Sequence, residues 1–178
     1  MNQKNEQVKE RFTLLSNRAI DEQPPQVVTV GTLNIGPREK QLVLEALDNN
    51  RLSYGPMSQR FEAEFANAHN CRFGVISNSG TSALQIALQT LKELHGWEDG
   101  DEVIVPAVTF VATANIVLHN RMNPVLVDVE PDYYELNPEL LAEKMSPRTR
   151  AIIPVHLFGH PADMDPILNV ASRARLKV

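Results

Sequence analysis

The chain has 178 residues, enough for roughly one domain of ordinary size. Its composition, 43% hydrophobic and 22% charged residues, is typical of a globular protein with a substantial core. The formal net charge of -5 gives no electrostatic reason to expect nucleic acid or an anionic membrane as a partner.

Two further features indicate the compartment. The single cysteine, Cys71, allows no internal disulfide bond, which fits a reducing environment. The N-terminal residues are polar and of mixed charge, unlike a signal peptide. The most apolar region, 103–118, is interrupted by Pro106 and by polar residues, so it is too broken to span a bilayer. We therefore expect a cytoplasmic protein that does not cross a membrane.

Regular secondary structure is expected to begin at Leu33, after an N-terminal extension formed by residues 1–32. Apolar residues at helical spacing predict two early helices, at 37–48 and 60–69. From residue 71 onward, predicted strands and helices alternate. The strands are predicted at 71–77, 101–107, 123–129 and 149–156, and the helices at 81–94, 109–120, 137–145 and 163–176.

The four predicted strands are apolar and rich in β-branched residues, without polar alternation. Such strands are typical of a parallel sheet that helices cover on both faces. The sequence therefore predicts an α/β fold of three layers, α/β/α, with a mostly parallel sheet. Because residues 176–178 resemble the start of a further strand, we expect residues 33–178 to be the front part of a longer domain.

The segment SNSGTSALQIALQTL, residues 77–91, joins a predicted strand to a predicted helix. Ligands of an open parallel sheet gather at the carboxyl ends of its strands, and a helix N-terminus suits a phosphate. We therefore interpret the four small residues Ser79, Gly80, Thr81 and Ser82 as a phosphate-binding cup. A capped helix with spare small residues explains them equally well. The chain has no GxGxxG and no GKS or GKT motif, so dinucleotide and NTPase loops are not supported.

Two more predicted strand ends carry candidate residues. Phe110 follows the segment PAVT and could face a planar heteroaromatic cofactor, although a core aromatic is the commoner role. His156 ends the segment PVH, where the alternative is a capping or hydrogen-bonded histidine. The HLFGH spacing does not lead us to expect a metal site, because Pro154, Gly159 and Pro161 disfavour the helix it would need.

Six segments follow one another along the chain: SYGPMSQRFEAEFA, SNSGTSALQIAL, DGDEVIVPAVTFVATAN, NPVLVDVEPDYYELNPELL, SPRTRAIIPVHLFGHPADMDPI and LKV. Together they resemble the DegT/DnrJ/StrS sugar aminotransferase family over residues 33–178. The resemblance implies the large domain of the PLP-transferase fold type I, with pyridoxal 5'-phosphate as cofactor. It also implies transamination of a nucleotide-linked keto-sugar in polysaccharide biosynthesis, an amino-acid donor such as glutamate, and a homodimer with residues 52–58 near the partner.

The resemblance also assigns roles by position. The cofactor phosphate would be held by Ser79, Gly80 and Thr81, with help from Ser82. Phe110 would stack on the pyridine ring, and His156 belongs to the same cofactor-binding set. Tyr54 and Gly55 would lie near the entrance for the nucleotide sugar.

Two functional groups of the family have no counterpart in this chain. The Schiff-base lysine and the aspartate that pairs with the pyridinium nitrogen are expected after Val178. Both are needed for the chemistry, so we expect this chain alone to be inactive. Two alternatives stay open: a deoxysugar 3-dehydratase of the same family, in which histidine replaces the lysine, and a non-catalytic member that keeps the fold for binding or regulation.

Overall fold

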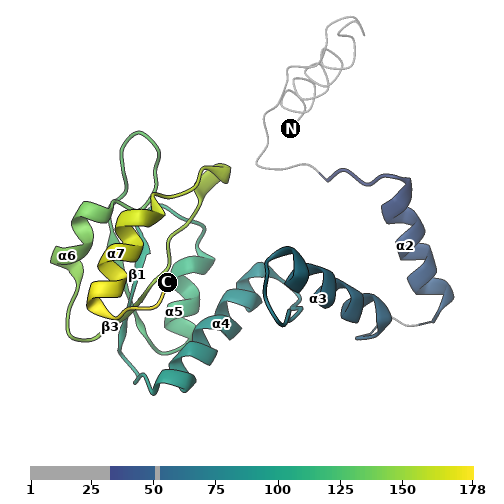
Figure 1. Cartoon of the computed structure of the whole chain (residues 1–178), viewed down its shortest axis with the longest axis horizontal. Helices are drawn as coiled ribbons and strands as arrows, with labels where there is room; N and C mark the ends of the chain where they lie inside the picture. The colour runs from purple at the N-terminus through teal and green to yellow at the C-terminus, as the bar shows by residue number, and fades with distance from the viewer. Residues whose placement is uncertain (1–32, 51–52) are drawn as a thin grey trace, which may run out of the picture. The chain divides into compact units, whose positions relative to one another are not determined.

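A computed structural model of the chain describes residues 33–50 and 53–178 (Figure 1). The chain divides into two compact units between Ser53 and Tyr54. In the first unit, the described residues form helix α2 (Pro37–Asp48), which matches the predicted helix and has no buried side chain. The predicted N-terminal extension, residues 1–32, lies outside the described residues and stays a prediction.

The second unit holds the remaining described elements, three strands among helices (Figure 1). Their bounds, with η for 3-10 helices, are α3 (Pro56–Ala68), α4 (Gly80–His95), β1 (Glu102–Pro106), α5 (Ala112–His119), β2 (Asn123–Val127), η1 (Pro138–Leu140), α6 (Leu141–Lys144), β3 (Thr149–Ile152), η2 (Leu157–Gly159) and α7 (Met164–Ala174). None of the described helices is both long and apolar enough to cross a membrane.

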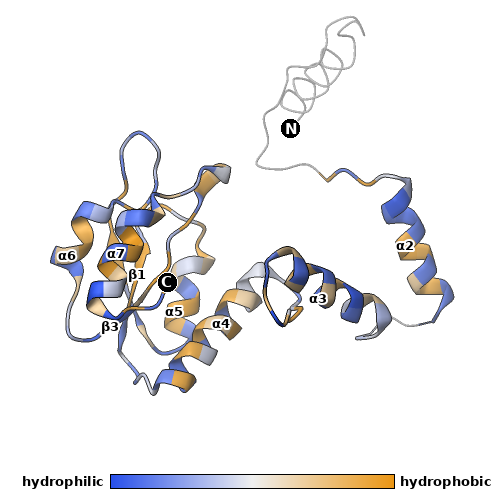
Figure 2. Ribbon diagram, viewed as in Figure 1, coloured by the Kyte–Doolittle hydropathy of each residue, from blue (hydrophilic) through white to orange (hydrophobic). Residues whose placement is uncertain are grey.

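The three strands form a parallel sheet in the order β2-β1-β3. Side chains alternate along β1, so Val103 and Val105 pack with α4 and α5 on one face, while Ile104 packs with α6 and α7 on the other. Figure 2 shows the hydrophobic β1 between these helices. The predicted three-layer α/β/α fold with a parallel sheet is confirmed. Lys177 forms a parallel bridge with Ala151, which agrees with the predicted start of a further strand.

The predicted strand at 71–77 is wrong for the described structure. This segment pairs with no described strand, and its side chains are exposed, with Phe73 at 75% and Val75 at 79%. It lies instead against α3, where the Ile76 N–H donates a hydrogen bond to the Glu62 carboxylate (2.9 Å). An apolar, β-prone sequence becomes a strand only when a neighbouring strand supplies backbone partners. Within the described residues, no such neighbour is present for 71–77.

Several helices and strands begin or end at residues other than those predicted. The helix predicted at 60–69 begins earlier, at Pro56, because a proline fits the first helical turn. The helix predicted at 109–120 begins at Ala112. The helix predicted at 137–145 divides into η1 and α6, and the strand predicted at 149–156 ends at Ile152. The helix predicted at 163–176 ends at Ala174, because Arg175 takes a left-handed conformation.

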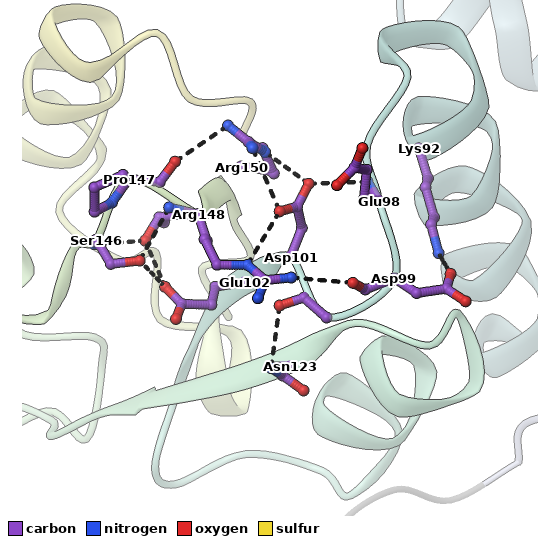
Figure 3. Close-up of polar contacts among 12 residues, drawn as sticks. Lys92, Glu98, Asp99, Asp101, Glu102, Asn123, Ser146, Pro147, Arg148 and Arg150 are labelled. Atoms are coloured by element: carbon purple, nitrogen blue, oxygen red, sulfur yellow. Dashed lines mark hydrogen bonds and ion pairs between the residues drawn. The ribbon is translucent and has the colours of Figure 1, made fainter.

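A buried carboxylate joins the amino ends of β1 and β3 (Figure 3). Asp101, 2% exposed, accepts hydrogen bonds from Arg150 (2.8 Å) and from the Glu98 N–H (2.9 Å), and Arg148 approaches it at 3.6 Å. The hydrogen bond from Arg150 is the largest cause that lowers the pKa of Asp101. This cluster therefore closes the edge of the sheet opposite to the carboxyl ends of the strands.

We predict that Asp101→Asn lowers the free energy of unfolding by about 1.5–3 kcal/mol at neutral pH, the usual range for hydrogen bonds to charged groups. Since folding lowers the pKa of Asp101, its contribution is complete above about pH 4 and is lost as the pH falls through the folded-state pKa. Urea unfolding of both proteins between neutral and acidic pH measures this. Asp132→Asn, at an exposed position, is the control. An equal effect at every pH would contradict the prediction.

Candidate functional site

The four small residues at the start of α4 divide into two roles. Ser79 is the N-cap, in extended backbone conformation, and its side chain accepts a hydrogen bond from the Ser82 N–H (3.2 Å). The two hydroxyl groups of Ser79 and Ser82 also contact each other (3.2 Å), and Ser77 donates to the Ser79 carbonyl (2.9 Å). Ser79 and Ser82 therefore serve the helix itself.

Gly80 and Thr81 take no part in these capping hydrogen bonds. Within the described residues, no hydrogen bond engages the Gly80 N–H, the Thr81 N–H or the Thr81 hydroxyl. A Cβ placed on Gly80 would meet no heavy atom within 4 Å outside its own helix and chain neighbours. Since α4 has 16 residues, its aligned peptide dipoles favour negative charge at this end. Two free N–H groups and one hydroxyl around open space fit a phosphate.

Open grooves lie on both sides of this helix end. One, of about 370 Å³, lies between α3 and residues 74–80, with Phe61 and Phe65 among its lining residues. The other, of about 720 Å³, follows α4 from Ser82 to Glu93, with His119–Arg121 at its far wall. A phosphate at Gly80 and Thr81 would therefore have room for the rest of its molecule.

Phe110 lies in the turn between β1 and α5, at the carboxyl end of the central strand. Its side chain is 71% exposed, so it is not the core aromatic considered as the alternative. The turn is held by the hydroxyl groups of Thr109 and Thr113 (2.9 Å) and by the Thr113 N–H, which donates to the Phe110 carbonyl (3.0 Å). The ring is therefore available to a planar ligand, and its stacking role stays a prediction.

His156 follows β3 and is exposed, but one ring nitrogen is engaged. Its Nδ1 accepts a hydrogen bond from the backbone N–H of Ala162 (3.0 Å). This hydrogen bond fits the structural role that the sequence left open for this residue. Among the described residues, no group of three or more His, Cys, Asp and Glu side chains is placed to hold a metal ion.

Tyr54 and Gly55 precede α3. Gly55 is buried as the N-cap of that helix. The Tyr54 hydroxyl donates a hydrogen bond to the Glu62 carboxylate (2.7 Å), which raises the pKa of Tyr54 and lowers that of Glu62. Glu62 also accepts from the Ile76 N–H, so it connects Tyr54 with the segment that leads to α4. Sequence reasoning missed Glu62, because no local motif marks a carboxylate that joins two distant segments.

The structure thus brings some of the predicted site residues together. Ser79–Ser82 form one cluster, and Glu62 joins Tyr54 to the segment before it. Phe110 and His156 follow the carboxyl ends of β1 and β3, but neither lines a groove beside the cluster. The site is divided because residues 71–77 do not join the sheet, so the described strands do not fix the start of α4 beside their own carboxyl ends.

The fold and the site define a class of protein: an α/β protein with a parallel sheet and a helix N-terminus suited to an anionic group. Comparison with known families makes this more specific. The model of the DegT/DnrJ/EryC1/StrS aminotransferase family matches residues 34–178. The chain belongs to this family.

Individual relatives agree with this membership. The chain is 40% identical over 152 residues to GDP-perosamine synthase of Caulobacter vibrioides, covering 85% of this chain and 40% of that protein. It is 43% identical over 136 residues to dTDP-3-amino-3,4,6-trideoxy-alpha-D-glucose transaminase of Streptomyces venezuelae, covering 76% and 35%. The crystal structure of ntda from Bacillus subtilis with bound cofactor PMP matches with a TM-score of 0.76 and 35% identity, covering 91% and 37%. The chain therefore spans well under half of the length of these relatives.

Two glycines, one at the start of α4 and one that caps its end, test whether Gly80 serves the fold or a ligand. We predict that Gly80→Ala changes the free energy of unfolding by less than about 0.5 kcal/mol, because the space is open and its backbone needs no positive φ. Gly96→Ala, at the other end of the helix, should cost about 1 kcal/mol or more, because Gly96 has φ +62°. Denaturant unfolding of both variants gives the comparison. Equal losses would show that Gly80 is needed by the fold.

Proposed function

We propose that this chain is the cofactor-binding part of a PLP-dependent aminotransferase that acts on a nucleotide-linked keto-sugar with an amino-acid donor. The observation that carries the proposal is the pair of free N–H groups and the free hydroxyl at Gly80 and Thr81. Family membership and the functions named for two relatives, a perosamine synthase and a sugar transaminase, support the substrate class.

The residues would divide the work as follows. The N–H groups of Gly80 and Thr81 and the Thr81 hydroxyl would bind the phosphate group, while Ser79 and Ser82 keep the helix start in shape. Once residues 71–77 join the sheet and the start of α4 lies at its carboxyl edge, Phe110 would cover one face of the cofactor ring. Tyr54 would contact the sugar nucleotide. PLP, when bound, supplies an electron-accepting pyridine ring. His156 would support this edge of the site through the loop that its Nδ1 holds.

Two threonines on α4 give a matched test. We predict that Thr81→Val weakens PLP binding by about 1.5 kcal/mol, roughly tenfold, because a hydrogen bond to a charged group is lost. Thr90→Val should leave PLP binding unchanged, because Thr90 lies more than two turns of α4 beyond Thr81. Its hydroxyl donates to the Ile86 carbonyl within the helix. Equilibrium dialysis with PLP measures both affinities. If the two variants bind PLP as tightly as the unmodified chain, the phosphate site is wrong.

The lysines of the chain lead to a second prediction. Neither groove beside the start of α4 is lined by a lysine. Lys92, the lysine on α4 itself, is 6% exposed and holds the Asp99 carboxylate (2.6 Å) and the Asn120 carbonyl (2.7 Å). We therefore expect that PLP followed by borohydride leaves no stoichiometric adduct on any lysine, and that the chain alone transfers no amino group from glutamate. Mass spectrometry after digestion would locate an adduct, and one fully modified lysine would contradict this prediction.

We further propose that the protein works as a homodimer in the cytoplasm. Support comes from α4, whose buried residues are Leu88 and Lys92, while its apolar residues Ile86 and Leu94 are 51% and 73% exposed. Exposed apolar surface of this kind marks a contact with another polypeptide. We predict that the complete protein shows a dimer mass in light scattering at micromolar concentration. A monomer mass throughout the concentration range would refute the assembly.

A further inference from the structure

A buried carboxylate outside the proposed cofactor site carries a further inference. Glu135 lies at the end of the loop that follows β2, where the bridge between Val129 and Leu136 closes the loop. Its side chain is 7% exposed, and its carboxylate contacts Nδ1 of the His160 ring. Within the described residues, no other hydrogen bond reaches this carboxylate. Because a buried carboxylate needs a donor, the His160 proton is assigned to Nδ1.

The assignment determines what His160 offers to a ligand. A neutral imidazole has one donor and one acceptor nitrogen, so a proton on Nδ1 leaves Nε2 as an acceptor. The ring is held in place by Tyr133, which stacks on it in parallel at 5.0 Å between centroids and 3° between planes. His160 remains 56% exposed, and no hydrogen bond within the described part of the chain engages its Nε2.

His156, four residues earlier on the same loop, is held in the other tautomer of the neutral ring. Its Nδ1 accepts the N–H of Ala162, a residue that is 4% exposed, so this nitrogen carries no proton in the neutral ring. The proton then lies on Nε2, which becomes a donor. The short loop around η2 therefore carries one donor, Nε2 of His156, and one acceptor, Nε2 of His160. The Ala162 N–H determines the first, and the Glu135 carboxylate determines the second.

We propose that His156 and His160 form a recognition element for sugar hydroxyl groups, in which Glu135 positions His160 as the acceptor and the Ala162 N–H positions His156 as the donor. A hydroxyl group both donates and accepts, so this pair is complementary to a polyol. The loop follows β3 at the carboxyl edge of the sheet, where ligands of parallel sheets bind. The sugar class rests on the proposed function.

The first experiment measures the two protonation states without cofactor or activity. In the ¹⁵N-labelled chain at about pH 8.5, well above the ordinary histidine range, we expect NMR to show the proton on Nδ1 of His160 and on Nε2 of His156. Glu135→Gln should allow both tautomers of His160, while Glu139→Gln, at an exposed position nearby, should change nothing. The same tautomer on both rings, or no response to Glu135→Gln, would overturn the proposal.

The second experiment tests the ligand with GDP-mannose as the probe and GDP as its control. We expect GDP-mannose to shift the Nε2 signals of His156 and His160, with GDP alone leaving them in place and His119, on α5, unaffected by either. His160→Phe keeps a ring to stack on Tyr133, and it should weaken GDP-mannose binding about tenfold without changing GDP binding. No shift, or equal shifts with both probes, would overturn the sugar role. Because PLP is absent from both experiments, failure here leaves the Thr81 test of the cofactor site standing.

Discussion

The burial of β1 on both faces is the constraint on which the rest of the second unit depends. Val103, Ile104 and Val105 are each 0% exposed, and both backbone edges of the strand pair with neighbours. Side chains that alternate in this way need one helical layer above and one below. Thus α4 and α5 are fixed on one face and α6 and α7 on the other, and the turns that carry Phe110 and His156 follow from the same sheet.

Ion pairs join the strands at the amino edge of the sheet, and the carboxyl edge differs from it. At the amino edge, Asp101 accepts hydrogen bonds from Arg150, while Arg148 approaches it and donates to the Asp99 carbonyl. At the carboxyl edge, Phe110 and one nitrogen of each loop histidine have no partner in the described residues. This contrast fits the proposal that the carboxyl edge of the sheet binds a ligand.

Much of this fold could be predicted from the sequence, because strand burial and helix periodicity are local patterns. The runs around Ile104 and Val125 predicted β1 and β2 correctly. The segment 71–77 has the same apolar pattern and still failed, because a strand also requires a pairing partner, and the pattern of one segment does not contain that information.

The candidate site was predictable in position but not in detail. The sequence located the small residues at the start of α4, since they separate an apolar segment from an apolar helix. It could not assign the cap to Ser79 and Ser82 and leave Thr81 free, because that depends on side-chain rotamers. The pairs Tyr54–Glu62 and Glu135–His160 were missed for another reason: each joins segments that only the fold brings together.

Because α4 and α5 cover the same face of the sheet, they determine on which side of β1 a strand formed by residues 71–77 would lie. The connection from β1 to β2 runs through α5 on that face, and α4 leads into β1 on the same face. Connections between parallel strands are right-handed almost without exception, so two crossovers on one face must move in the same direction. A strand formed by 71–77 would therefore enter the sheet on the β3 side of β1, beyond the position of Lys177. Entry there would bring the start of α4 to the same edge as His156.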